Sequence, residues 1–268
     1  MTHNSLHEKV IRDFGEQWNA LQDNSGYYGD IKVLEDICSP LLKIGDLQNK
    51  FIIDIGSGTG RLTNLVIKAG AAHVFSLEPS SSYDILLKNT EINKSKITYI
   101  NTDGSNIPDY ISYDYAFSIG VLHHIPNPNP TIISAFNCLK KGGFMVIWVY
   151  GTEGNFLYLF MAKILRLITV LMPHNLLYKL SKFLIKPLKF YAFLCTNIKL
   201  PMYQYMRNHI NKLNDSSLLI TIYDQLNPSY AKYYKKHEAL SLLKSNGFQN
   251  CKIHHRHRYS WTVIGQKI

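Results

Sequence analysis

The sequence predicts an α/β fold built on a mostly parallel β-sheet. Between residues 51 and 150, short apolar runs of strand length alternate with segments of helix length, and this alternation is typical of βαβ units. A glycine-rich turn follows the first of these strands, as expected where a strand passes directly into a helix and a ligand approaches the backbone. The expected strands are 51–55, 73–79, 97–103, 114–121 and 142–150. The expected helices are 61–70, 83–93 and 129–140.

Segments on either side extend this core. Residues 1–50 are expected to form a helical N-terminal cap, in which Phe14 and Trp18 are four residues apart and share one helix face. Near the C-terminus we expect a helix at 236–246 and strands at 251–257 and 261–267. The ligand-binding domain is therefore expected to comprise residues 51–154 and 228–268.

An insert between these two parts, residues 155–227, is expected to form an apolar and basic helical lid. Three evenly spaced prolines are expected to break it into about three helices: Pro173, Pro187 and Pro201. The chain has a net charge of +10, and nearly all of it lies in 155–214, which contains nine basic residues and no Asp or Glu. The basic residues are Lys163, Arg166, Lys179, Lys182, Lys186, Lys189, Lys199, Arg207 and Lys212. This concentration argues against general nucleic-acid binding and favours a local anionic partner, either an acceptor molecule or an anionic membrane touched peripherally through 155–214.

The composition is that of a folded chain, with 46% hydrophobic and 18% charged residues. Its four cysteines are scattered and show neither a CxxC pair nor zinc-ligand spacing, so we expect free thiols and no metal. The N-terminal residues are polar and charged, which predicts a protein without a secretion signal. The expected location is cytoplasmic, with peripheral contact at the inner membrane face as a further hypothesis.

The strongest ligand-binding signal is the sequence Asp54-Ile55-Gly56-Ser57-Gly58-Thr59-Gly60. Glycines there allow a tight turn and a close approach of ligand to backbone. The turn is too short to wrap a pyrophosphate as nicotinamide-binding turns do, and no GK[ST] follows, so a phosphate-binding loop is disfavoured. The cofactor-binding candidates are therefore Asp54, Gly56, Ser57, Gly58 and Gly60.

Further candidates lie at the ends of the next three strands. Glu78, followed by Pro79, ends the second strand and is placed to accept both hydroxyls of a ribose. Asp103, followed by Gly104, ends the third strand and is placed to accept an adenine amino group. Gly120, Val121 and Leu122 follow the fourth strand. All of these positions are carboxyl ends of strands, the edge at which open α/β sheets bind ligands.

These motifs together resemble the class I S-adenosylmethionine-dependent methyltransferases. The resemblance covers residues 50–150 and rests on DIGSGTG, LEPS, NTDGSNIP, YDYAFSIGVLHHIPNP and LKKGGFMVIWVYG. It implies a Rossmann-like, mostly parallel seven-stranded sheet with an antiparallel last strand, and S-adenosylmethionine as the cofactor. It also implies that Asp54 lies near the cofactor amino group, that Glu78 holds the ribose and that Asp103 holds the adenine. The glycines of the turn would line the methionine portion, and residues 120–122 would pass beneath the sulfonium.

One departure from the motifs of the family narrows the range of expected acceptors. Family members that methylate exocyclic amines of DNA bases carry an (N/D)PPY motif after the fourth strand, where this chain has GVLHH. That position instead supplies His124 and His123 as candidate bases for an oxygen acceptor. A structural role for either histidine remains open.

Candidate acceptor-binding residues are Tyr150, Tyr223, Asp224 and Tyr230, and surface positions for them remain an alternative. The run His254-His255-Arg256-His257-Arg258 is interpreted as a solvated strand edge, because no cysteine or carboxylate completes a ligand set.

The favoured function is methylation of a small-molecule or lipid-linked acceptor, in particular O-methylation of a sugar or secondary metabolite. The alternatives are methylation of a quinone-type lipid at a membrane surface and a cofactor-binding scaffold without turnover. RNA methylation is disfavoured by the lack of basic charge outside the insert.

Overall fold

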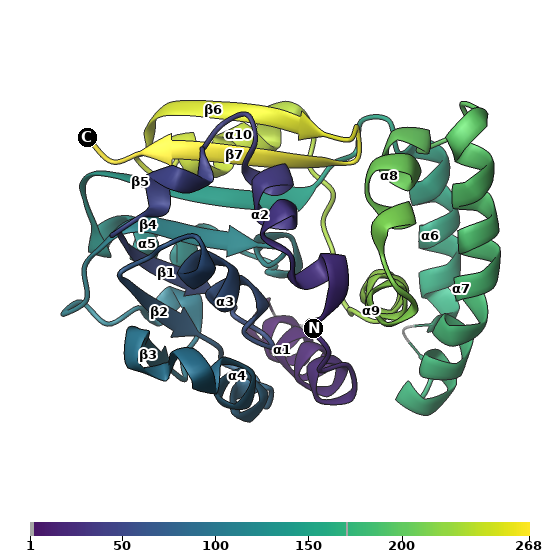
Figure 1. Ribbon diagram of the computed structural model, residues 1–268, viewed down its shortest axis with the longest axis horizontal. Coiled ribbons are helices and arrows are strands. Elements are labelled where there is room, and N and C mark those ends of the chain that lie inside the picture. Colours follow the sequence, from purple (N-terminus) through teal and green to yellow (C-terminus); the bar gives the residue numbers. More distant parts are fainter. Residues whose placement is uncertain (1–2, 170) are drawn as a thin grey trace.

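The computed structural model describes residues 3–169 and 171–268, and its centre is a seven-stranded sheet (Figure 1). In chain order the strands are β1 Phe51–Ile55, β2 His73–Leu77, β3 Ile97–Ile100, β4 Tyr113–Ile119, β5 Leu139–Tyr150, β6 Gln249–Arg256 and β7 Ser260–Gln266. Their order across the sheet is β3-β2-β1-β4-β5-β7-β6. The first five strands are parallel, and β7 is antiparallel to both of its neighbours. The predicted fold class is confirmed.

Helices cover both faces of this sheet because its strands are apolar on both sides. In β1, Ile52 packs on one face with α2 (Ile31–Cys38) and α3 (Arg61–Lys68). The alternate residues Ile53 and Ile55 pack on the other face with α5 (Asn129–Cys138) and α10 (Lys236–Lys244). Helix α4 (Tyr83–Thr90) connects β2 to β3. Side chains that alternate along a strand point to opposite faces, so two separate cores hold the sheet rigid beneath its carboxyl edge.

The junction of α5 and β5 differs from the sequence prediction. The helix ends at Cys138, and β5 begins at Leu139 instead of 142, because Leu139 is buried and pairs with Tyr113 of β4. Glycines 142 and 143 lie inside the strand beside a register shift, and a Cβ on Gly143 would lie 2.8 Å from the Asp114 carbonyl oxygen. The glycine pair therefore marks a strand irregularity where a backbone approaches closely, not a turn.

The described residues of the insert form four α-helices on the side of the molecule away from β3 (Figure 1): α6 Phe156–Thr169, α7 His174–Asn197, α8 Tyr203–Asn208 and α9 Asp215–Leu226. Their shared core joins α7, α8 and α9 to aromatic residues of β5 and the β6–β7 turn. The expected break at Pro187 was wrong, since α7 continues through it. Pro187 and Phe183, whose carbonyl loses its helical donor, are both on the exposed side of α7, where water can replace the missing bond.

The N-terminal segment is divided between two positions. Helix α1 (His3–Ala20) lies below the carboxyl ends of the strands, close to α9 (Figure 1), whereas α2 packs on the sheet. Short 3-10 turns complete the chain: η1 Gly26–Gly29, η2 Ile44–Leu47, η3 Glu91–Lys96, η4 Gly104–Asn106, η5 Leu122–His124 and η6 Ile210–Lys212. Among the described residues, none of the helices has the length and apolarity needed to span a bilayer.

Candidate functional site

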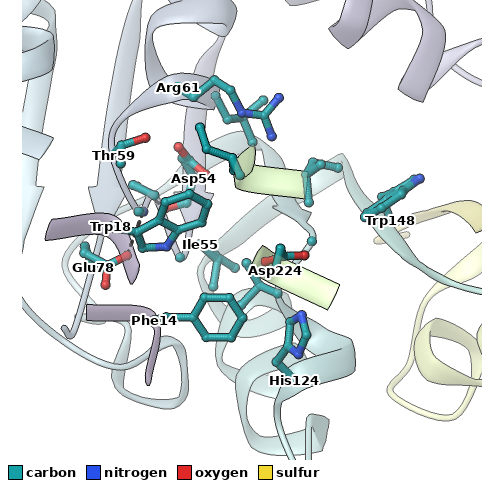
Figure 2. Close-up of a pocket in the computed structure, with 18 of the residues that line it drawn as sticks. Phe14, Trp18, Asp54, Ile55, Thr59, Arg61, Glu78, His124, Trp148 and Asp224 are labelled. Carbon is teal, nitrogen blue, oxygen red and sulfur yellow. Dashed lines mark hydrogen bonds between the residues drawn. The ribbon is translucent and has the colours of Figure 1, made fainter. Parts of the chain in front are cut away.

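A cavity lies at the carboxyl edge of the sheet, between the strand ends, α1 and α9 (Figure 2). Thirteen of the residues predicted for the site line it: Asp54, Gly56, Ser57, Gly58, Glu78, Pro79, Asp103, Gly104, Gly120, Val121, His124, Tyr150 and Asp224. Segments that are distant in sequence meet there because parallel strands end at one edge.

Two positions of the turn after β1, Gly56 and Gly58, require residues without a side chain. Gly56 and Gly58 have φ values of +76° and +54°, in the left-handed region that favours glycine. A Cβ on Gly56 would lie 2.7 Å from Val121 Cγ2, and a Cβ on Gly58 would lie 3.2 Å from Trp18 Nε1. The turn therefore forms a smooth backbone cradle, closed on one side by Val121 and on the other by Trp18.

Glu78 is held in place by this turn. Its Oε2 accepts a hydrogen bond from the Gly58 amide at 2.7 Å, and its Oε1 accepts one from the Ser80 amide at 3.0 Å. The side chain is buried yet borders the cavity. Each carboxylate oxygen can accept a second hydrogen bond, so the geometry suits a ligand with two neighbouring hydroxyls.

Asp54 is a buried carboxyl at the base of the same turn. It accepts a hydrogen bond from Thr63 Oγ1 at 2.7 Å. Burial raises the pKa of Asp54 to about 6, against the opposing effect of the Thr63 hydrogen bond. A cation in the cavity would favour the ionised form, so this position suits the amino group of an amino-acid ligand.

Asp103 is engaged by helix α1. Its Oδ2 lies 2.5 Å from His7 Nε2, and its Oδ1 accepts the Ser105 amide at 2.7 Å. Burial opposes ionisation, but the hydrogen bonds from His7 and Ser105 outweigh it and lower the pKa of Asp103 to about 2. An adenine amino group would therefore share this carboxylate with His7.

His124 is the one candidate base that reaches the cavity. Its Nδ1 lies 2.9 Å from the carbonyl oxygen of Tyr230, and because a carbonyl can only accept, Nδ1 carries the proton. In the neutral ring Nε2 then has a free lone pair. That atom is buried and has no hydrogen-bond partner among the described residues. Burial lowers the pKa of His124, although the nearby carboxylate of Asp224 opposes this, so the ring is a neutral proton acceptor at physiological pH.

Five predicted site residues do not line the cavity. Leu122 belongs to the sheet core. His123 is fully buried and packs against Tyr150, with ring centroids 3.9 Å apart. Gly60 allows α3 to approach α4, since a Cβ there would lie 2.5 Å from Thr90.

The other two act away from the cavity or through the backbone. The Tyr223 hydroxyl bonds to His174 of α7 at 2.5 Å, so it ties α9 to α7. Tyr230 contributes its carbonyl to His124, not its ring. Backbone geometry decides these outcomes, and spacing along the sequence does not reveal it.

Helix α1 supplies a wall that the sequence interpretation did not assign to the site. His7, Val10, Phe14 and Trp18 lie on one face of α1 and line the cavity, with Phe14 4.6 Å from the His124 ring (Figure 2). Asp13 fixes α1 to the end of α9 by accepting the Ser229 amide at 2.9 Å. The three- and four-residue spacing of this stripe was the available signal.

The acceptor side of the cavity is aromatic and polar. The Tyr150 hydroxyl donates to Asp224 Oδ2 at 2.6 Å and accepts from Gln225 Nε2 at 2.6 Å. Burial raises the pKa of Tyr150 well above its usual value, so this hydroxyl stays protonated. Trp148 and Tyr259 line the same side, which gives flat apolar walls with a few hydrogen-bonding groups.

The strand-edge interpretation of the histidine-rich run was wrong for Arg256. This side chain is only 3% exposed, lines the cavity and donates two hydrogen bonds to Asp36 Oδ2. His255 stacks on Trp261 with ring centroids 3.9 Å apart, and His257 also bonds to Asp36. Within the described residues, no group of three or more His, Cys, Asp or Glu side chains is placed to hold a metal ion.

Part of this chain is similar in sequence to known methyltransferases. Residues 53–147 match the family model described as a methyltransferase domain. A tRNA U34 carboxymethyltransferase from Shewanella halifaxensis is 27% identical over 115 residues, which is 42% of this chain and 35% of the relative. The corresponding enzyme from Pseudomonas paraeruginosa is 27% identical over 113 residues, 41% of this chain and 35% of the relative. The chain thus spans about a third of the length of these curated relatives.

Solved structures share the fold over longer stretches. A magnesium protoporphyrin IX methyltransferase from Synechocystis PCC 6803, crystallised with S-adenosylhomocysteine, aligns over all of both chains with a TM-score of 0.58 and 13% identity. An O-methyltransferase family protein from Burkholderia thailandensis aligns over 88% of this chain and 55% of its own, with a TM-score of 0.52 and 11% identity. Residues 53–147 thus match a methyltransferase domain, and the chain has the fold of the class I, Rossmann-like S-adenosylmethionine-dependent methyltransferases.

Proposed function

We propose that this chain transfers the methyl group of S-adenosylmethionine to an oxygen of a small-molecule or lipid-linked acceptor, such as a sugar or a secondary metabolite. The observation that carries the proposal is the buried, unpartnered Nε2 of His124 at the cavity. A buried polar atom without a partner costs free energy, so its presence at a cavity supports a role toward a ligand.

The cofactor fits the residues of the cradle. When bound, S-adenosylmethionine supplies an electrophilic methyl group on a sulfonium. Glu78 would accept the ribose hydroxyls, Asp54 would face the amino group, and the turn at Gly56–Gly58 would let the methionine portion lie against backbone. The role of Asp103 toward adenine is proposed together with its bond to His7.

His124 would act on the acceptor. Its Nε2 would take the proton of the acceptor hydroxyl as that oxygen receives the methyl group that S-adenosylmethionine would supply. General-base assistance of this kind contributes about a hundred- to ten-thousandfold. Alignment of the acceptor by the aromatic walls would supply the remaining rate acceleration.

The walls of the cavity support a small acceptor. Helix α1 closes one side and α9 the other, and Trp148, Tyr150 and Tyr259 offer flat surfaces for an apolar or ring-containing molecule. A quinone-type lipid has the same character and is the second candidate, favoured by the basic insert, which also supports peripheral contact at the inner membrane face. Both candidates place the chemistry in one cavity.

The test uses S-adenosylmethionine labelled in its methyl group. Purified protein is incubated with the organic-solvent extract of cells, with a water-soluble metabolite fraction and, separately, with total tRNA. We expect label in a small molecule of the first two samples and its loss with His124→Gln. Transfer to tRNA alone would overturn the proposed acceptor. Tight cofactor binding without methyl transfer to any sample would contradict the proposed catalytic activity and favour a cofactor-binding scaffold.

A further inference from the structure

The outer faces of α6 and α7 expose an unusual amount of apolar surface. Most of the exposed large apolar side chains among the described residues lie between 156 and 198. Phe156, Leu167 and Leu171 are 82%, 70% and 83% exposed, and Phe183 is 72% exposed. Exposed apolar side chains gathered in one part of a protein favour an interaction site there.

Helix α7 arranges this surface as a mixed stripe. Six side chains follow each other at intervals of three and four residues, and all are exposed: Leu176, Lys179, Phe183, Lys186, Phe190 and Phe193. Such intervals place residues on one face of a helix. A shallow depression on this face is lined by Lys179, Lys182, Phe183, Lys186 and Pro187.

The cations of this face are available to a partner. No ion pair joins Lys179, Lys182 or Lys186 to any acid in the described part of the chain, whereas Lys189 pairs with Asp215. Residues 155–214 contain no Asp or Glu that could neutralise them. The partner must therefore supply negative charge.

This face points away from the cavity. The opposite side of α7 carries Leu177 and Ile185, which belong to the core shared with α9. Helix α6 is fixed to the end of α9 by Arg166 and Thr169, which donate to the carbonyls of Gln225 and Leu226 at 2.7 and 3.0 Å. The exposed side chains are therefore not the inner lining of a lid, and α9 separates them from the cavity that it lines.

We infer that the outer face of α6 and α7 binds the surface of an anionic lipid bilayer. Phenylalanine and leucine side chains enter the boundary between headgroups and acyl chains, and the interleaved lysines extend to the lipid phosphates. A second copy of this chain would bring like charges together across the contact, and a nucleic acid would not bury the aliphatic residues of α6. This binding is independent of methyl transfer.

The test is flotation of the full-length protein with two kinds of vesicle, phosphatidylcholine alone and phosphatidylcholine mixed with phosphatidylglycerol. We expect binding to the mixed vesicles that falls with added salt. The variant K179Q/K182Q/K186Q should bind them about a hundredfold more weakly, from about fivefold for each lysine near an anionic surface. The variant F183S/F190S/F193S should lose binding to a similar or greater extent.

Matched controls separate a specific loss of vesicle binding from a general loss of positive charge and from unfolding. K68Q/K88Q/K96Q removes three exposed lysines on the opposite side of the molecule and should bind like the wild type. All variants should keep their Tm and their affinity for S-adenosylmethionine. The inference is overturned if wild-type protein ignores both vesicles, or if both α7 variants bind as wild type. It is also overturned if the α7 phenylalanines prove to hold a dimer, or if the lysine variant loses tRNA binding while vesicle binding stays intact.

Discussion

The carboxyl edge of the sheet and the helical insert differ in the charge that they offer a partner. At the edge, four carboxylates face one cavity, from Asp54, Glu78, Asp103 and, on α9, Asp224, and each is buried or half-buried and accepts hydrogen bonds. The insert carries nine cations and no carboxylate between 155 and 214. The edge therefore suits a cationic ligand with hydroxyl groups, and the insert suits an anionic surface. The carboxylates that line the cavity are buried or half-buried and most cations of the insert are exposed, so the two regions suit partners of opposite charge.

His124 lies where the two regions meet, and its loss should have the largest effect. His124→Gln keeps a similar volume but cannot take up a proton. We expect kcat to fall by about a hundred- to ten-thousandfold while the Kd for S-adenosylmethionine changes little. His254→Gln, on β6 and outside the cavity lining, is the control. A variant that keeps most of its kcat would remove His124 as the base.

The backbone cradle should be nearly as sensitive. Gly56→Ala places a Cβ at a φ of +76° and 2.7 Å from Val121. Relief of this clash would shift the turn from the position that receives the cofactor, and a resulting cost of about 2 kcal/mol or more would weaken cofactor binding at least about thirtyfold by calorimetry. Gly142→Ala has the same sign of φ, +81°, but its Cβ would meet no atom of the described residues within 4 Å, so it should cost stability without changing cofactor affinity. Equal losses in both variants would show that the turn matters only for folding.

These two regions were not equally predictable from sequence. The strand ends, the glycine turn and Glu78 were predicted because backbone geometry imposes local residue types on them. The sheet followed from the alternation of apolar segments, although its glycine pair at 142–143 proved to lie within a strand.

The rest depended on contacts between distant segments. Arg256 reaches the cavity because Asp36, 220 residues earlier, neutralises it, and no local pattern encodes that pairing. Pro187 is tolerated in α7 because it lies on an exposed face, which is a tertiary property. His123 and His124 are neighbours of identical type, and tertiary contacts distinguish them: His124 lines the cavity and bonds to the Tyr230 carbonyl, whereas His123 packs against Tyr150.

The raised pKa of Asp54 predicts how the edge responds to pH. Asp54 titrates at about 6 without ligand, and a cationic amino group beside it favours its ionised form. As pH falls below 6 the carboxyl must lose a proton for the cation to bind, so affinity for S-adenosylmethionine should fall by up to about tenfold per pH unit. Calorimetry from pH 8 to pH 5 measures this dependence. Asp54→Asn should bind more weakly at neutral pH and show a flat profile, and a flat wild-type profile would separate Asp54 from the cofactor amine.

The smallest effect is expected on the stability of the protein when lysines of the insert are replaced. The lysines of α7 are exposed and, apart from Lys189, have no ion pair in the part of the chain that the structure describes. Exposed substitutions of this kind change the free energy of unfolding by about 0.5 kcal/mol or less. The K179Q/K182Q/K186Q protein should therefore unfold in urea at the wild-type midpoint, or slightly above it because like charges are removed.

Asp36→Asn provides the opposite case. It leaves the buried guanidinium of Arg256 without its charge partner, which should cost about 3–5 kcal/mol. A charge that is buried and paired is thus expected to be structural, and a charge that is exposed and unpaired to serve a partner. If the α7 lysine variant were destabilised as much as Asp36→Asn, the insert cations would support the fold, and the contrast between the two regions would fail.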